Sequence, residues 1–468
     1  MQTLPERRSA SNTIPGDFAM DQLVAALGRA LNTRRGSGSF ERAEQSGIEL
    51  CNEALRRTLE EELQRRADDL GEELLVDGKL CRRHEPGTVT YHSLCGPLEV
   101  RRYTYREQGV RNGPTVVPLE IAAGLLHRAT PALASAVGLG YADRTTRALA
   151  EDFQAAGRVP PSRSTLERMA VKIGTDVKGA VGRIEPALRR CERIPKEAVA
   201  ITIGLDRTTV PMLEEATEGK QAVQYRMAYV GTVCITNRDV EALQIRRYAA
   251  PAHEGPAQLL SRVKADLGHA MRQRPDLNVA VVQDGAPELW GLVGDLLDEL
   301  GLKKSAVRRI DRYHATQYMN GALDALRVPP PIKAKILDRW KHELDTKQRA
   351  IDRITAEIEE MQRGLPEKMF HDVHRFWNYL FWNYLFCNYR LIRYATLHKL
   401  GIPEGSGVTE AACKSLITWR TKRCGQRWTE RGVIAITALV SIVHSDRWAR
   451  FWKSFTKASR KSLELIRA

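Results

Sequence analysis

The spacing of apolar residues predicts a long helix and then a β-hairpin near the start of the chain. Residues 41–75 place apolar side chains at helical spacing, among charged residues of opposite sign four positions apart. Two runs with alternating apolar positions follow, TVTYHSL and LEVRRYTYR, and Cys95-Gly96-Pro97 separates them as a turn signal. We therefore expect residues 41–110 to form a helix followed by a hairpin.

The pattern is again helical over residues 111–190, with breaks expected at 138–141 and 157–162. After the second break, Ser164 and Glu167 have the spacing of a capping box, which predicts the start of a helix. Two helices joined by a short turn are compatible with a helix-turn-helix DNA-binding motif. Its DNA-facing residues would be Arg163, Arg168 and Lys172. A pair of packed helices in a small bundle is an equally weighted alternative.

From residue 195 to about 455 the pattern changes to alternating strands and helices. The strand candidates are AVAITIGLD, QYRMAYVGTVCITN, ALQIRRYAA, LNVAVVQDG and AVRRIDRYH. Helical segments separate the later ones, which predicts an α/β domain whose mixed sheet is flanked by helices.

Residues 315–400 predict a large helical insertion within this domain. The insertion contains a local duplication, FWNYL at 376–380 and again at 381–385. We interpret the duplication as an aromatic helix face buried against the α/β domain. A stacking platform for nucleic acid is the alternative.

The net charge of the chain indicates what kind of partner it binds. The chain has 468 residues, of which 43% are hydrophobic, enough for a sizeable core. Lys and Arg outnumber Asp and Glu by 72 to 57, giving a formal charge of +15. Such a surface favours a polyanion, nucleic acid foremost. Residues 1–40 are interpreted as a flexible arm and 456–468 as a basic tail.

The remaining bulk features exclude several classes of protein. No apolar run approaches the ~18 residues of a membrane span, and the N-terminus lacks an apolar signal core, so we expect a cytoplasmic, nucleoid-associated protein. Eight cysteines occur without a CxxC pair, which argues against a zinc ribbon and against a disulfide scaffold.

Three acidic residues could build a metal site. Asp206 and Asp284 end two predicted strands of the α/β region, where carboxylates come side by side. Neighbouring carboxylates repel each other, and hard cations such as Mg²⁺ neutralise them. Glu410 lies just inside a predicted helix that follows a Gly-Ser-Gly turn, and it is the candidate for a third ligand. The competing acids Glu288 and Glu404 are interpreted as surface or capping residues.

Basic residues cluster on or just after the helix of Glu410. They are Lys414, Arg420, Lys422, Arg423 and Arg427. They could bind phosphates beside the metal, or they could form the solvated face of an amphipathic helix. Trp428 and Trp448 lie in basic sequence and could stack on unpaired bases, although burial in the core is commoner for Trp.

Four blocks in this order, LDRTTVPM, QDGAP, DRYH and GSGVTEAACKSLITWRTKRCGQRW, resemble bacterial insertion-sequence transposases with a DDE catalytic core, related to the mutator-like group. The resemblance implies an RNase H-like fold in which Asp206, Asp284 and Glu410 hold Mg²⁺, for which Mn²⁺ can substitute. Asp311 and His314 match an Asp-x-x-His element of such enzymes. For His314 we expect DNA positioning or proton handling, with a structural histidine at the strand end as the alternative.

The resemblance also implies partners and a reaction. It implies binding of double-stranded DNA at the terminal repeats of a mobile element, cleavage, and joining to target DNA by a homodimer or higher oligomer. The hairpin of related proteins often leads into a Cys-rich metal-binding knuckle, whereas here the chain continues REQGVRNGPTVVP. We therefore predict no zinc. Two other functions stay open: a catalytically inactive, domesticated DNA-binding protein, and a structure-specific nuclease.

Overall fold

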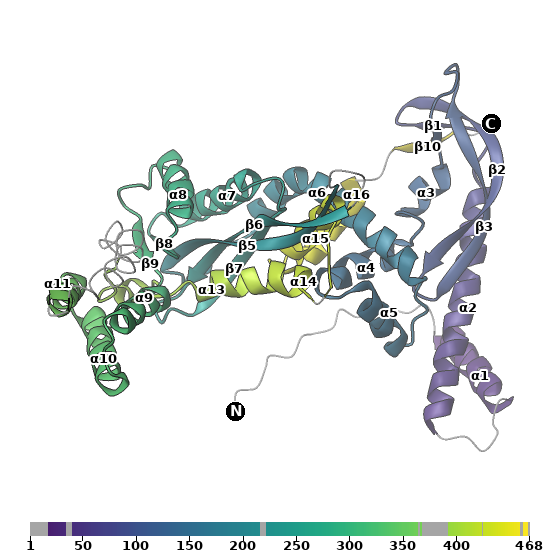
Figure 1. The fold of residues 1–468 in the computed structure, drawn as a ribbon. Coiled ribbons are helices and arrows are strands. Elements are labelled where there is room, and N and C mark those ends of the chain that lie inside the picture. Colours follow the sequence, from purple (N-terminus) through teal and green to yellow (C-terminus); the bar gives the residue numbers. More distant parts are fainter. Residues whose placement is uncertain are drawn as a thin grey trace. The chain divides into compact units, whose positions relative to one another are not determined.

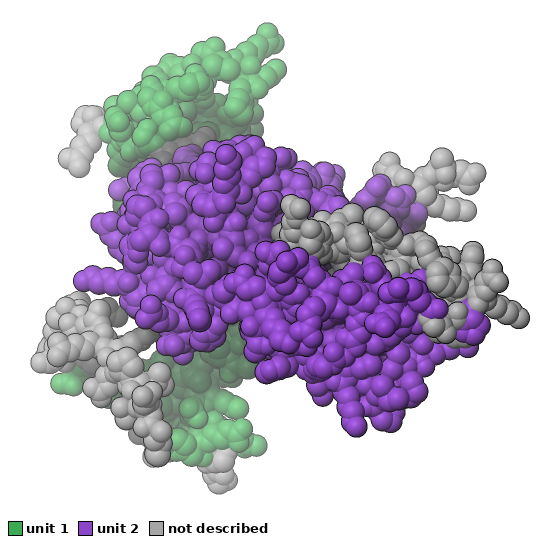
Figure 2. Space-filling model, turned by 90° about the vertical axis from the view of Figure 1, so that its left-hand side faces the viewer, with its two compact units in different colours: residues 1–133, 147–166, 460–468 green, residues 134–146, 167–459 purple. Residues whose placement is uncertain are grey.

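The computed structural model describes residues 17–33, 40–215, 221–363, 366, 392–423, 425–458 and 462–466. The chain divides into two compact units (Figure 2). Unit 1 comprises residues 1–133, 147–166 and 460–468, and unit 2 comprises residues 134–146 and 167–459. Each unit contains one five-stranded sheet.

Unit 1 has an antiparallel sheet in the order β10-β1-β2-β3-β4. Its strands are β1 (Glu73–Val76), β2 (Lys79–Ser93), β3 (Gly96–Glu107), β4 (Thr115–Val116) and β10 (Leu463–Leu465). Its helices are α1 (Asp17–Thr33), α2 (Phe40–Asp68), α3 (Pro118–Ala123) and α5 (Thr146–Ala155). Apolar residues of α2 and of the strands, such as Leu63 and Tyr91, share one core.

The predicted hairpin is confirmed in this unit. Ser93 pairs with Gly96, so the turn consists of Leu94 and Cys95, and Gly96 adopts a φ of +123°. The helix predicted over 41–75 ends at Asp68, because its last residues enter β1. Helix α1 lies inside the segment interpreted as a flexible arm, and β10 lies inside the predicted basic tail.

Helices α4 (Pro131–Asp143) and α6 (Arg163–Cys191) follow the sheet of unit 1 in the sequence. The break predicted at 138–141 is wrong, because α4 continues through it. Gly138 gives space to an aromatic ring, since a Cβ there would lie 2.5 Å from Trp448. The predicted cap of α6 is displaced by two residues, since the Ser162 hydroxyl accepts the Thr165 amide at 3.4 Å.

Unit 2 contains a mixed sheet in the order β7-β6-β5-β8-β9 (Figure 1). Its strands are β5 (Ala200–Glu215), β6 (Gln221–Thr236), β7 (Ala242–Ala250), β8 (Asn278–Gln283) and β9 (Val307–Ile310). Strands β5, β6 and β7 are antiparallel, whereas β5, β8 and β9 are parallel. The predicted α/β architecture with a helix-flanked mixed sheet is therefore present.

Alternating residues of the central strands pack against helices on the two faces of this sheet. Ile201 and Ile203 share a core with α7 (Ala257–Gln273) and α8 (Pro287–Glu299). Ala200 instead belongs to the core formed with the helices of the predicted insertion. Those helices are α9 (Arg312–Ala325), α10 (Pro330–Thr346) and α11 (Ala350–Arg363). The duplicated FWNYL segments lie outside the described residues.

The chain then passes through η3 (His398–Leu400) into a helix of three consecutive segments. They are α13 (Gly407–Ala412), the π-helical segment η4 (Cys413–Thr418) and α14 (Trp419–Thr421). Helices α15 (Glu430–Val443) and α16 (Trp448–Ala458) complete the unit. Trp428 and Trp448 are both buried, which confirms the core interpretation of these residues.

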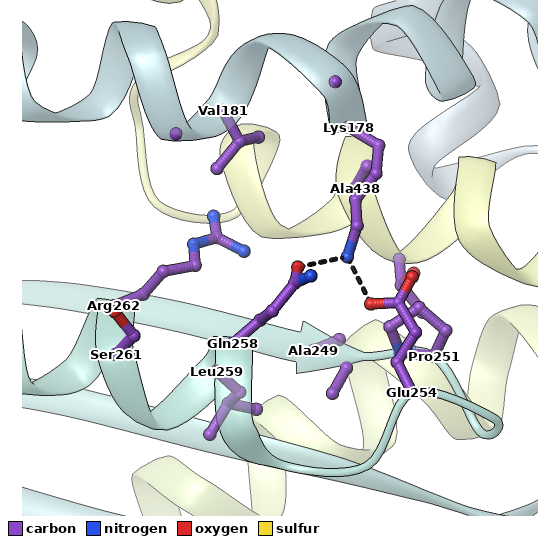
Figure 3. A pocket seen from close by; sticks show the side chains of 14 residues that line it. Lys178, Val181, Ala249, Pro251, Glu254, Gln258, Leu259, Ser261, Arg262 and Ala438 are labelled. Carbon is purple, nitrogen blue, oxygen red and sulfur yellow. Dashed lines mark hydrogen bonds and ion pairs between the residues drawn. The ribbon is translucent and has the colours of Figure 1, made fainter.

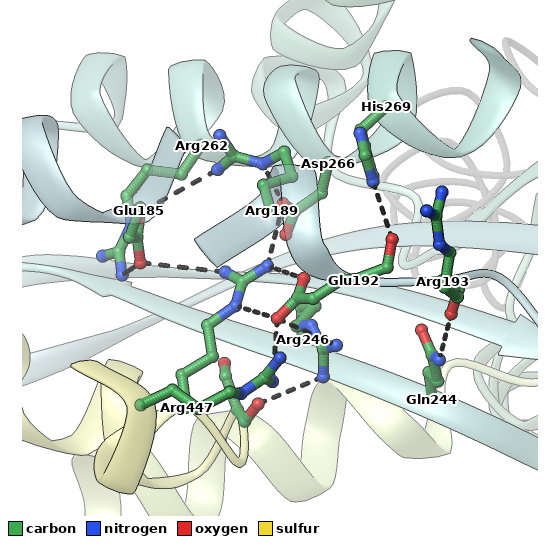
Figure 4. A network of polar contacts seen from close by, with 12 residues as sticks. Glu185, Arg189, Glu192, Arg193, Gln244, Arg246, Arg262, Asp266, His269 and Arg447 are labelled. Carbon is green, nitrogen blue, oxygen red and sulfur yellow. Dashed lines mark hydrogen bonds and ion pairs between the residues drawn. The ribbon is translucent and has the colours of Figure 1, made fainter. Parts of the chain in front are cut away.

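A buried ion network connects α6, α7, β7 and the segment between α15 and α16 (Figure 4). The Arg447 side chain is fully buried. Its guanidinium donates to Glu192 at 2.7 and 2.9 Å, to Asp266 at 3.2 Å and to the Tyr248 hydroxyl at 2.5 Å. Burial alone would raise the pKa of Glu192, but hydrogen bonds and charge from Arg447 lower it below its usual value. Within the described residues, no helix is long and apolar enough to span a membrane.

Candidate metal centre

Strand register brings Asp206 and Asp284 to the same level of the sheet. Strands β5 and β8 are parallel, and Ile203 pairs with Val281. Each aspartate lies three residues beyond one member of this pair. Asp206 does not end its strand as predicted, because β5 continues to Glu215 in a long antiparallel pairing with β6. Strand β8 does end at this level, and the sheet therefore opens beside Asp206.

A cavity of about 300 Å³ lies where the sheet opens. Its lining includes all three predicted metal ligands, Asp206, Asp284 and Glu410, together with His314 and Lys414. These residues come from β5, the loop after β8, α13, α9 and η4. Residues separated by up to 208 positions in the sequence, from 206 to 414, thus face one cavity.

The environment of Asp206 is short of positive charge. Burial raises the pKa of Asp206 above its usual value, and the negative charges of Asp284 and Glu410 raise it further. Hydrogen bonds from the Arg207 amide and the Cys413 thiol act in the opposite direction. Carboxylates that repel each other in a half-buried cavity favour binding of a cation, which removes the repulsion.

Asp284 is oriented by the loop that leads into α8. Its carboxylate accepts the amide of Ala286 at 3.0 Å, and its own carbonyl accepts the Trp290 indole N–H at 2.8 Å. Pro287 then starts α8, where its missing amide is not needed. Glu288 lies away from this arrangement and binds Arg207 and the Tyr229 hydroxyl, in agreement with its interpretation as a surface residue.

Glu410 reaches the cavity because α13 lies very close to β5. Thr409 contacts the sheet through its hydroxyl, which is 2.7 Å from the Thr232 hydroxyl. The close approach depends on Gly204, since a Cβ there would collide with the Thr409 hydroxyl and lie 2.9 Å from the carbonyl of Val282. The close approach of α13 thus requires a glycine at position 204 of β5. Glu410, the residue after Thr409, lines the same cavity as Asp206.

His314 lies in the first turn of α9 at the edge of the cavity. Its Nδ1 is 3.3 Å from Asp311 Oδ1 and 3.9 Å from Glu410 Oε1. The contact with Asp311 raises the pKa of His314, burial lowers it, and the charges of Glu410 and Asp284 raise it again. The net shift is upward, so His314 is more easily protonated than an ordinary histidine.

Among the described residues, Asp311, His314 and Glu410 are the group whose ligand atoms all lie within 4.8 Å of one another. This group shares only Glu410 with the predicted metal triad. Asp311 is 2% exposed and does not line the cavity. The predicted ligands Asp206, Asp284 and Glu410 all line the cavity, but among the described residues their ligand atoms do not all lie within 4.8 Å of one another.

The predicted basic residues divide into exposed and buried ones. Lys414, Lys422, Arg423 and Arg427 are exposed. Lys414 lies 3.8 Å from Glu410, and Lys422 binds the hydroxyl of Thr208, which lines the cavity. Arg420 does not belong to this surface: it is 2% exposed and donates to the carbonyls of Tyr141 and Ala142. Arg420 therefore supports the fold, whereas the other four basic residues face solvent.

The three basic residues of the possible helix-turn-helix lie on α6, and Arg163, Arg168 and Lys172 are all exposed there. Most of α6 belongs to unit 2, whereas α5 belongs to unit 1. Their role in binding DNA remains a prediction.

The sequence interpretation missed Cys413, Ser406 and Trp419. Cys413 lies on η4 and donates to Asp206, and Ser406 precedes α13 and binds Asp311. Neither residue type is distinctive in a sequence. Trp419 is 64% exposed on the same helix as Lys414 and Lys422. Its position among basic residues could have indicated a stacking role. The two tryptophans considered for that role in the sequence, Trp428 and Trp448, are instead both buried.

A larger cavity, of about 490 Å³, lies among α6, α7, α15 and the end of β7 (Figure 3). Its charged side chains are already paired. Lys178 binds Glu254 at 2.5 Å and Gln258 at 2.8 Å (Figure 3). Arg262 binds Glu185 at 2.6 Å (Figure 4). We therefore place the candidate site in the smaller cavity, where the carboxylates of Asp206, Asp284 and Glu410 converge.

The comparisons with known proteins give little support of their own. No protein-family model matches the chain, and no curated protein matches it. One solved structure with a weak similarity is the Drosophila P element transposase strand transfer complex. The match has 13% sequence identity and a TM-score of 0.22, and it covers 71% of this chain and 81% of the other. At that TM-score we draw no argument from it.

Proposed function

We propose that the protein is a DDE transposase that cleaves DNA at the ends of a mobile element and joins the freed strand to target DNA. The observation that carries this proposal is the convergence of Asp206, Asp284 and Glu410 on one cavity at the edge of the unit 2 sheet. Its three antiparallel strands followed by two parallel strands support an RNase H-like core over residues 195–455, with an insertion at about 315–400.

In this proposal Asp206, Asp284 and Glu410 hold Mg²⁺ or Mn²⁺. The oxygen-rich set suits these hard cations, and the upward pKa shift of Asp206 agrees with a site that a cation would neutralise. Bound there, such ions would activate a water or a 3′-hydroxyl and stabilise the leaving oxygen of a phosphodiester. His314, with its raised pKa, would donate a hydrogen bond or a proton to the DNA beside the ligands.

The exposed basic residues Lys414, Lys422, Arg423 and Arg427 would bind the DNA backbone next to the cavity. The regions 1–40, 41–110 and 111–190 would contribute to recognition of the element ends, and two or more copies would hold both ends. This contribution and the oligomeric state rest on the resemblance described above.

Metal dependence of DNA cleavage and joining tests the function directly. The substrate is a labelled DNA fragment that carries the sequences flanking the protein's own gene. We expect cleavage and joining with Mg²⁺ or Mn²⁺ and neither reaction in EDTA. Cleavage without joining would instead support the structure-specific nuclease. Salt-sensitive binding without cleavage in any metal would support the domesticated DNA-binding protein.

Trp419 is expected to contribute to binding of unpaired DNA. It is 64% exposed beside the phosphate-binding lysines, and an exposed indole stacks on a base with about 1–3 kcal/mol. We expect Trp419→Ala to weaken binding of a fluorescent dT oligonucleotide about tenfold, and Trp419→Phe to retain most of the affinity. Ile332→Ala, which removes a 52% exposed apolar side chain from α10, is the matched control. Equal affinities of Trp419→Ala and this control would remove Trp419 from the DNA-binding surface.

A further inference from the structure

Asp311 lies where three segments of unit 2 meet. Its amide donates to the carbonyl of Gln283 at 2.9 Å, next to Asp284 at the end of β8. Its carboxylate caps α9 by accepting the amide of His314 at 2.9 Å. The same carboxylate accepts the amide and the hydroxyl of Ser406, the residue before α13. Asp311 thus connects the sheet edge through its amide with the start of α9 and the segment before α13 through its carboxylate, and Ser406 lies 95 residues from it in the sequence.

The contacts of Asp311 occupy both of its oxygens. Oδ1 accepts the His314 amide and lies 3.3 Å from His314 Nδ1, whereas Oδ2 accepts both donors of Ser406, the hydroxyl at 2.9 Å. Burial would raise the pKa of Asp311, but the hydrogen bonds from His314 and Ser406 outweigh burial and hold the pKa well below its usual range. The lone pairs of the carboxylate are therefore used by protein donors.

Ser406 in turn fixes the position of Glu410. The carbonyl of Ser406 accepts the amides of Thr409 at 2.8 Å and Glu410 at 3.0 Å. Gly405 allows the close approach, because a Cβ there would lie 3.1 Å from Asp311 Oδ2. The first turn of α13 is thus anchored to Asp311, and α13 carries the metal ligand that the helical insertion separates from the other two.

We propose that Asp311 is a positioning residue that clamps the Glu410 segment against the sheet edge and does not itself bind metal. The inference rests on the proposed function, since it assumes that Glu410 is a ligand. It also explains why Asp311 does not line the cavity, although its ligand atom lies within 4.8 Å of those of His314 and Glu410. Outer residues of this kind typically alter metal affinity 10- to 100-fold when they are replaced.

Two substitutions separate clamping from direct ligation. Asp311→Asn keeps an oxygen that can cap α9, because Asn is as good a cap as Asp, but its amide group faces the donors of Ser406. Ser406→Ala removes one hydrogen bond of the clamp and leaves Asp311 intact. Asp324→Asn is the matched control, since Asp324 lies on the same helix and its side chain is 56% exposed in an ion pair with Lys333.

The first measurement is Mn²⁺ binding to the full chain without DNA, followed by the electron paramagnetic resonance signal of the free ion. We expect Asp311→Asn to weaken Mn²⁺ binding about 10- to 100-fold and Ser406→Ala about fivefold. The double variant should be no weaker than Asp311→Asn alone, because both changes break one clamp. Loss of binding in Asp311→Asn together with wild-type affinity in Ser406→Ala would make Asp311 a direct ligand and overturn the proposal.

The second measurement does not depend on metal. Hydrogen–deuterium exchange of the peptide spanning 404–412 reports the Ser406 amide, which donates to Asp311, and the first amides of α13. Both clamp variants should exchange there faster than wild type, with Asp324→Asn unchanged. Wild-type exchange in Asp311→Asn would refute the clamp. Faster exchange in a protein that binds no Mn²⁺ would keep the clamp and refute the metal site of the proposed function.

Discussion

Replacing Asp206 or Asp284 by Asn is expected to abolish DNA cleavage and joining, lowering the rate at least about a thousandfold, or ~4 kcal/mol. Each carboxylate lines the cavity, and the two stand at the same level of β5 and β8. An amide keeps the shape and the contact with the neighbouring backbone amide but loses the charge that binds the cation. Single-turnover cleavage at saturating Mg²⁺ and Mn²⁺ measures the effect.

Asp295→Asn is the matched control for charge, because Asp295 is exposed on α8. Its activity should equal that of the wild type. The free energy of unfolding of all three variants should lie within ~0.5 kcal/mol of the wild-type value. For Asp206→Asn we expect any change to be an increase in stability, because burial beside Asp284 and Glu410 opposes ionisation of the carboxylate. Full activity in either folded site variant would contradict the assignment of the metal ligands.

Alternating apolar patterns predicted the sheet of unit 2 well. Strand β7 has the bounds of its apolar run, and β8 ends one residue before Asp284 as the sequence indicated. The parallel pairing of β5 and β8 then brings together two acids that lie 78 residues apart, since 284 minus 206 is 78. The middle of β8, residues 279–282, is a continuous apolar run because helices cover both faces of the strand, so its length can be read from the local sequence.

Contacts made over long distances in the sequence were not predictable in the same way. Gly138 was interpreted as a break in a helix, although α4 continues through it and its missing side chain leaves space for the Trp448 ring. Arg420 was assigned to DNA, although carbonyls of α4 bind its guanidinium. The local sequence around a glycine is the same whether it breaks a helix or packs against a ring, and that around an arginine is the same whether it binds DNA or a buried carbonyl. Which role applies depends on a residue from a distant segment.

Asp311 illustrates the same limit within the site. The sequence places it three residues before His314, a spacing that resembles a catalytic element of transposases. The structure adds Ser406, whose amide and hydroxyl both turn toward the Asp311 carboxylate. Nothing in the local sequence indicates that contact, because a large helical insertion separates the two residues.

Replacing Arg447 by Ala is expected to destabilise the protein by about 3–5 kcal/mol. The guanidinium is fully buried and neutralises Glu192 and Asp266, which are buried as well (Figure 4). Without it these carboxylates lose their main source of positive charge while they remain out of water. The free energy of unfolding in urea, followed by tryptophan fluorescence, measures the loss.

Arg450 supplies the matched control, since it binds the same Glu192 carboxylate at 3.1 Å but its own side chain is 47% exposed. Solvent screens such a pair, and we expect Arg450→Ala to cost less than about 1 kcal/mol. Because Arg447 holds the pKa of Glu192 below its usual value, this part of the wild-type stability is present above the usual pKa of a glutamate and is lost as the pH falls below it, so the stability difference between wild type and Arg447→Ala should shrink at acidic pH. A loss no larger than that of Arg450→Ala would mean that burial of these charges contributes little, and that the ends of α6, α7 and β7 are held together by their apolar contacts alone.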